Sequence, residues 1–168
     1  MGRDVKFWKK DGSFKLRVCG IIKVGDKYLI NNCDNCSFWS YPGGHVVVGE
    51  NTDNAVLREV LEETNIECDI EKLLATVQLF FKREDDMPFH EIGFYYLLSP
   101  KQEIEPIDFN LEELDNGQLR NHQFRWVSID ELDKIDVRPA DLKQVLRNNL
   151  ERQHIIHNED LEEKEPNA

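Results

Sequence analysis

The sequence predicts a single domain of the α/β (α+β) class, in which a mixed β-sheet is sandwiched between helices. The chain has 168 residues, which is close to the usual size of one domain, and 40% of them are hydrophobic, enough to bury a core. Short apolar runs rich in β-branched residues recur along the chain, and a stretch with helical periodicity separates them. Strands interleaved with helices are typical of layered domains of this class.

The first elements are predicted to form a β-hairpin. Residues 15–23 and 27–30 are rich in β-branched and aliphatic side chains, and the turn around Gly25 separates them. Residues 1–14 are basic, so we expect an N-terminal extension followed by the domain itself over 15–156.

A glycine turn, one helix and two strands are predicted next. Gly43 and Gly44 close a short aromatic segment, and the pattern then becomes helical over residues 52–64, with Thr52 as the expected N-cap. Two apolar runs, 73–81 and 92–98, indicate further strands.

The C-terminal third is predicted to contain a loop, a strand and two helices. Residues 101–118 are acidic and are interpreted as a long surface or active-site loop, whereas 123–127 indicate a strand. Ser128 is placed to cap a short helix, and a last helix is expected over 139–150. The acidic tail 157–168 is expected to be disordered.

Charge and cysteine content exclude several classes of protein. The net charge is −12 and the sequence pI is about 4.8, so we expect no long nucleic acid as a partner. A small anion remains compatible if metal ions lie between it and the protein.

Cys33 and Cys36 form a lone CxxC without the second ligand pair of a structural zinc site. No run has the length of a membrane span, so we expect a cytoplasmic enzyme without a membrane partner.

The helix predicted over residues 52–64 carries the chemistry. Glu59, Glu62 and Glu63 are neighbours at i, i+3 and i+4 spacing and repel one another, while the apolar side chains gather on the other face. A divalent cation would turn this repulsion into a binding site, although a solvated acidic face is the alternative. The preceding glycine turn and Glu50 favour a site for a metal–phosphate complex.

These residues resemble the Nudix hydrolase family, whose box is G-x5-E-x7-R-E-U-x-E-E-x-G-U, with U an aliphatic residue. Every spacing of the box is kept, and only its second glycine is replaced, by Asn65, which also tolerates the left-handed backbone expected at a helix end. The resemblance extends over about residues 15–150 and includes Trp39 and the segments 125–127 and 129–132. The matching box residues are Gly44, Glu50, Arg58, Glu59, Val60, Glu62, Glu63 and Ile66.

The resemblance implies a Nudix-like fold and the Mg²⁺-dependent hydrolysis of a phosphoanhydride bond, with Mn²⁺ as an alternative ion. It implies that Glu59 and Glu63 are the principal metal ligands and that Glu62 assists them. Arg58 would orient the glutamates and Glu50 would support them, so the expected catalytic residues are Glu63, Glu62, Arg58 and Glu50. The number of metal ions stays open.

On the substrate side, we expect Gly43, Gly44, His45 and Arg17 to contact the ligand. The Gly43 carbonyl is expected to complete the metal shell, and Arg17, in mid-strand, requires either a phosphate or an internal carboxylate. The expected partner is a small nucleoside diphosphate derivative or a nucleoside triphosphate.

Several alternatives stay open. The general base could be Glu63, Glu91, Glu112 or Glu113. The substrate could be a nucleoside triphosphate, a dinucleotide, ADP-ribose or a nucleotide sugar, because such selectivity resides in variable loops. The protein could act as a monomer or a homodimer. A non-catalytic ligand sensor on the same fold is the competing function, although the intact acids of the box favour hydrolysis.

Overall fold

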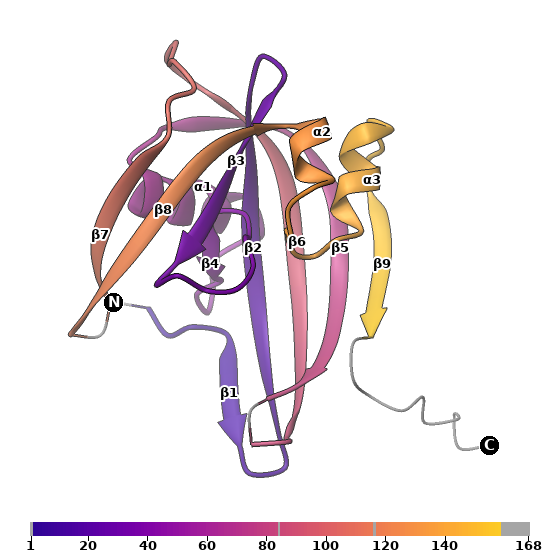
Figure 1. Cartoon of the computed structure of the whole chain (residues 1–168). Helices are drawn as coiled ribbons and strands as arrows, with labels where there is room; N and C mark the ends of the chain where they lie inside the picture. Colours follow the sequence, from indigo (N-terminus) through magenta and orange to yellow (C-terminus); the bar gives the residue numbers. More distant parts are fainter. Residues whose placement is uncertain (1, 84, 116, 159–168) are drawn as a thin grey trace.

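The architecture was obtained as a computed structural model that describes residues 2–83, 85–115 and 117–158. In these residues the strands of the sheet run in the order β7-β8-β3-β2-β6-β5-β9, and both β1 and β4 pair with β2 (Figure 1). The strands are β1 Lys6–Lys9, β2 Gly12–Val24, β3 Lys27–Cys33, β4 Gly43–His45, β5 Cys68–Lys82, β6 Pro88–Pro100, β7 Phe109–Asp115, β8 Gln118–Ser128 and β9 Gln153–Asn158. The helices are α1 Thr52–Thr64, α2 Ile129–Leu132 and α3 Leu142–Arg147.

The sheet is mixed and is covered by helices on both faces, which confirms the predicted fold class. The pairs β2–β6 and β5–β9 are parallel, whereas pairs such as β5–β6 and β3–β8 are antiparallel. Side chains of β2 alternate between the two faces. Val18 packs in one core cluster with Val60 of α1, and Ile21 packs in the other with Leu132 of α2 and Leu142 of α3.

Helix α1 has the bounds that its periodicity predicts, and its two ends show why. The side chain of Asn51, not that of Thr52, caps the N-terminus by accepting a hydrogen bond of 2.8 Å from the Asn54 N–H. At the other end Asn65 adopts the expected left-handed backbone, with φ of 58°, and its N–H donates to the Leu61 carbonyl. Leu61 is an apolar residue of this helix, yet it is 41% exposed.

Two predictions for the C-terminal third are wrong. The acidic segment 101–118 is not a loop throughout, because residues 109–115 form β7, which pairs antiparallel with β8. Phe109 stacks on Phe124 of β8 with ring centroids 4.7 Å apart, and this apolar contact helps to hold β7 against β8. The acidic residues of β7 do not resemble a strand in the sequence. The last helix is shorter than expected and covers only Leu142–Arg147, since Asn149 has a left-handed backbone with φ of 50°.

The remaining predicted elements are present. The hairpin of β2 and β3 and the strands β5, β6 and β8 are confirmed, each longer than its apolar run, and Ser128 caps α2 through a capping box. Residues 1–14, expected as an extension, contribute β1 and the first residues of β2 to the sheet. The tail begins within β9, and its residues 159–168 lie outside the described residues. In the described part of the chain, no helix is long and apolar enough to cross a membrane.

Candidate active site

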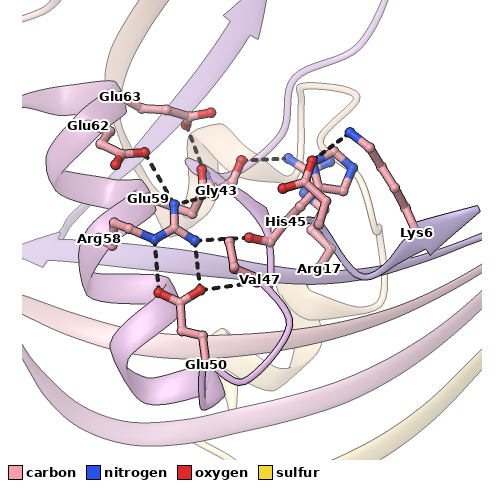
Figure 2. Close-up of polar contacts among 11 residues, drawn as sticks. Lys6, Arg17, Gly43, His45, Val47, Glu50, Arg58, Glu59, Glu62 and Glu63 are labelled. Atoms are coloured by element: carbon pink, nitrogen blue, oxygen red, sulfur yellow. Dashed lines mark hydrogen bonds and ion pairs between the residues drawn. The ribbon is translucent and has the colours of Figure 1, made fainter. Parts of the chain in front are cut away.

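The glycine turn and helix α1 are brought together by β2. Strand β4 pairs antiparallel with β2, and α1 packs beside it. The Gly43 N–H donates a hydrogen bond of 2.9 Å to Oε2 of Glu63 (Figure 2). A Cβ atom at Gly44 would lie only 2.5 Å from Cδ of Glu59 and closer still to its Oε2. The two carboxylates, four residues apart, therefore lie directly against the two glycines.

Arg58 connects the acids of the box through one guanidinium group (Figure 2). Its Nε and Nη2 donate to the two oxygens of Glu50 at 2.9 and 2.8 Å, which is a bidentate pair. Its Nη1 donates to Glu59 at 2.7 Å and to Glu62 at 3.2 Å, and Nη2 also donates to the His45 carbonyl at 3.1 Å. Arg58 thus joins the loop before α1 to Glu59 and Glu62 through hydrogen bonds.

Glu50 holds the loop that joins β4 to α1. Its Oε2 accepts a hydrogen bond of 3.1 Å from the Val47 N–H as well as those from Arg58. The hydrogen bonds from Arg58 are the main reason that the pKa of Glu50 lies below its ordinary value. Glu50 therefore supports the site as an ionised group.

The two carboxylates beside the glycines differ from Glu62 in their electrostatics. Burial raises the pKa of Glu63 to about 8, against the hydrogen bond from Gly43 and the nearby charge of Arg17, which lower it. Burial also raises the pKa of Glu59. The side chain of Glu62 is 56% exposed. Glu59 and Glu63 are thus poorly solvated carboxylates that a cation would stabilise in their charged form.

Glu59 and Glu63 are the carboxylates beside the glycine turn that could bind a divalent cation. In the described parts of the chain, no group of three or more His, Cys, Asp or Glu side chains converges on one point. Glu59 and Glu63 nevertheless each retain one oxygen without a hydrogen bond within the described residues. Mg²⁺ is commonly bound through one or two carboxylates, with water and substrate phosphates completing its octahedron. The residues present fit such a site without a direct contribution from Glu62.

Arg17 contacts Gly43, as Glu63 does. Its Nη2 donates a long hydrogen bond of 3.4 Å to the Gly43 carbonyl, and its Nε is buried without a hydrogen-bond partner in the described residues. No ion pair of Arg17 is found in the described residues, but Cys19 and, after it, the charges of Glu91 and Glu63 are close enough to raise the pKa of its guanidinium. A buried cation with unused donors is suited to an anionic ligand.

His45 follows the turn and enters a basic cluster. Burial, followed by the charge of Lys6, lowers the pKa of His45 to about 4, so the imidazole is neutral near pH 7. Its Nδ1 lies 3.8 Å from Oδ2 of Asp4, which pairs with Lys6 at 2.6 Å.

The external candidates for the general base differ in position. Glu91 is 4% exposed and pairs with Lys15 at 2.9 Å. On β7, Glu113 lies 3.3 Å from Nε2 of His122, and its charge contributes to the raised pKa of Glu63. Glu112, which is the next residue and is exposed, points to the opposite face of the strand. The structure therefore places Glu113 near the glutamates of α1.

The sequence interpretation missed a pocket of about 390 Å³ that begins at Arg17. Its lining includes Phe38, Glu91, Tyr95 and Arg138, which come from three segments of the chain. The apolar runs indicate the strands β5 and β6 but not their pairing, and it is the register of β2, β6 and β5 that brings alternate side chains beside Arg17. The pocket, the glycine turn and the acidic helix thus meet at β2, an arrangement typical of an enzyme that binds a small ligand beside clustered carboxylates.

Comparison with known proteins agrees with that class. The sequence matches the NUDIX domain family over residues 17–148. Bis(5′-nucleosyl)-tetraphosphatase (asymmetrical) of Mus musculus is 31% identical over 134 residues, which cover 69% of this chain and 81% of that protein. MutT4 of Mycobacterium tuberculosis, which bears a mutator-protein name, is 31% identical over 94 residues, covering 56% of this chain and 34% of that protein. Among solved structures, the MutT protein of Bacillus halodurans has a TM-score of 0.58 at 18% identity, covering 88% of this chain and 93% of that one.

The chain therefore belongs to the Nudix hydrolase family and is an enzyme of that type. It spans about a third of the length of the mycobacterial relative and most of the length of the mouse relative. The likeness to the Bacillus structure shows the shared fold.

Proposed function

We propose that the protein is a Mg²⁺-dependent pyrophosphohydrolase that splits a phosphoanhydride bond in a nucleoside diphosphate derivative or a nucleoside triphosphate. We further propose that it works in the cytoplasm, on small molecules, as a monomer or a homodimer, and that Mn²⁺ can replace Mg²⁺. The domain is proposed to cover residues 15–156. The observation that supports the reaction best is the placement of Glu59 and Glu63 against Gly43 and Gly44.

The residues would divide the work as follows. Glu59 and Glu63 would hold the ion, and Glu62 would contribute through water or through Arg58. When bound, the ion supplies charge neutralisation for the diphosphate and for the departing phosphate. Arg58 would keep Glu59 in position through Nη1, while both oxygens of Glu50 hold the Nε–Nη2 edge of the guanidinium.

The substrate and the attacking water would be handled by neighbouring groups. Arg17 would donate to a phosphate oxygen, since its buried Nε has no hydrogen-bond partner in the described residues. The Gly43 N–H is already engaged by Glu63, so the turn would contact phosphate through Gly44 and His45. Glu113 would accept the proton of the attacking water because it lies on the strand face that reaches Glu63, with Glu63 itself as the alternative base.

The proposal can be tested by turnover of purified protein on a panel of phosphoanhydrides with and without Mg²⁺. The panel includes nucleoside triphosphates, dinucleoside tetraphosphates, ADP-ribose and nucleotide sugars, and released phosphate and nucleotide are measured. We expect turnover of some of these compounds to require Mg²⁺ and to fall by roughly 10²-fold or more in Glu63→Gln. Tight binding of a panel member without any turnover would support the sensor alternative instead.

A further inference from the structure

The pocket beside Arg17 is lined by residues of the strands β2, β5 and β6 and of the loops that carry Phe38 and Arg138. Parallel pairing aligns Lys15 with Glu91 and Arg17 with Gly93, so these residues of β2 and β6 lie side by side. Leu79 of β5 is opposite Glu91 and also lines the pocket. The volume of about 390 Å³ falls within the usual range for small-molecule sites.

The walls of this pocket are aromatic. Phe38 lines it from the loop between β3 and β4, and Arg138 lies over the Phe38 ring at 4.6 Å. Phe81 lines it from β5 and stacks on Phe89 at 4.5 Å, which fixes the orientation of its ring. Rings that are held in place by a neighbour offer flat apolar surfaces, and such surfaces suit a planar ligand group better than a flexible or fully hydroxylated one.

One buried carboxylate, Glu91, lines this pocket together with basic side chains, among them Lys15 and Arg17. Its Oε2 pairs with Lys15 at 2.9 Å. A carboxylate only accepts hydrogen bonds, so its second oxygen can accept one from an N–H or O–H group of a ligand. Arg17 lines the same pocket and contacts Gly43, so one ligand molecule can reach both this pocket and the glutamates of α1.

We propose that this pocket binds a nucleobase and that Glu91 recognises it by accepting a hydrogen bond from an N–H group of the base. The inference rests on the proposed hydrolysis of nucleoside diphosphate derivatives and assigns their base to the aromatic pocket, next to the diphosphate beside Arg17. Glu91 is then a specificity residue rather than a general base. A ligand without an N–H donor leaves its carboxylate oxygen unpaired, which is a strong source of discrimination.

The test measures binding by calorimetry with compounds that cannot be cleaved. The probes, each with Mg²⁺, are the α,β-methylene diphosphates of adenosine, guanosine, cytidine, uridine and purine riboside, together with ribose 5-methylenediphosphonate, which has no base. Purine riboside can stack but has no N–H donor on its ring. We expect at least one N–H-bearing base to bind roughly tenfold or more tightly than the base-free probe.

Two variants test which residues provide the additional affinity for base-bearing probes. Glu91→Gln should reduce the affinity for the preferred base about tenfold and leave binding of the base-free and purine riboside probes unchanged, since neither uses the carboxylate. Phe38→Ala, in a surface loop, should weaken all base-bearing probes and should not affect the base-free one. Glu112→Gln, which replaces an exposed glutamate outside the pocket, is the matched control.

The outcomes separate this inference from the proposed function. If the base-free probe binds with Mg²⁺ but no base adds affinity, or if Glu91→Gln weakens every probe equally, the nucleobase assignment is refuted and the hydrolase proposal stands. If the Mg²⁺-dependent binding of the base-free probe is absent while bases still bind through Glu91, the diphosphate site is refuted and the pocket assignment stands.

Discussion

Replacing Gly44 by alanine should disable the site while leaving the fold almost intact. The new Cβ atom would lie 2.5 Å from Cδ of Glu59, and carbon atoms need about 3.5 Å, so the carboxyl group must retreat by about 1 Å. The obstacle is the end of a flexible side chain, so the free energy of unfolding should fall by only about 1 kcal/mol, which corresponds to about 2–4 °C in Tm. Arg58 holds Oε1 of the same carboxylate at 2.7 Å and resists the displacement.

The functional cost of Gly44→Ala should be much larger than its cost in stability. A misplacement of about 1 Å in a catalytic arrangement can reduce the rate roughly 10²-fold. We therefore expect kcat/KM on the best panel substrate to fall by about that factor, and the increase in Tm on adding Mg²⁺ to shrink. Both quantities can be measured on one preparation, by a phosphate-release assay and by thermal unfolding.

A matched glycine elsewhere supplies the control for Gly44→Ala. Gly25 lies in the turn between β2 and β3 with φ of +60°, and an added Cβ would meet no atom within 4 Å. Gly25→Ala should cost stability through backbone strain yet keep full activity and the full Mg²⁺ effect. If Gly44→Ala retained kcat/KM within threefold of the wild type, the contact between Gly44 and Glu59 would not position a functional group.

Three further results are expected. Gly20→Ala should lower the free energy of unfolding by about 1–3 kcal/mol, because the added Cβ would lie 2.5 Å from both Val60 and Leu98 in the core beneath α1. An unchanged midpoint in chemical denaturation would contradict this packing. Burial lowers the pKa of His45 from 6.5 to about 4, so protonation favours the unfolded state. The free energy of unfolding should be highest above pH 6.5 and should fall by about 1–2 kcal/mol towards pH 4. His45→Asn should not show this fall when unfolding is measured as a function of pH. Glu113→Gln should slow turnover at saturating substrate more than Glu112→Gln does, and equal rates for the two variants would exclude Glu113 as the base.

The sequence predicted helix α1 and its acidic face well because local signals agree there. Apolar periodicity and the left-handed Asn65 indicate the helix independently of the rest of the fold. The predicted N-cap, Thr52, lies one residue after the observed N-cap, Asn51. Both residue types are good N-caps, and only the backbone geometry distinguishes them. The spacing of the box located its residues. It could not show that Glu62 does not converge with Glu59 and Glu63, because that depends on side-chain positions.

Features formed by residues distant in sequence could not be predicted. Strand β7 is stabilised by its pairing with β8. Its acidic residues have low β-propensity, so the sequence alone does not indicate a strand there. The position of Glu113 near Glu63 follows from that same pairing. The aromatic pocket combines β2, β5 and β6 with two loops, so it depends on the parallel register of β2 with β6, which no local pattern specifies.

The pairing of β2 with four other strands has a consequence for how the molecule assembles. β2 contacts β1, β3, β4 and β6, and β6 begins at Pro88, far along the chain. Its hydrogen bonds to β6 can therefore form only after a loop of more than sixty residues has closed, which is an entropically slow step. Arg17 gains its neighbours in the same step that completes the sheet. The enzyme should thus acquire stability and ligand affinity simultaneously during refolding, without a stable intermediate that has one and lacks the other.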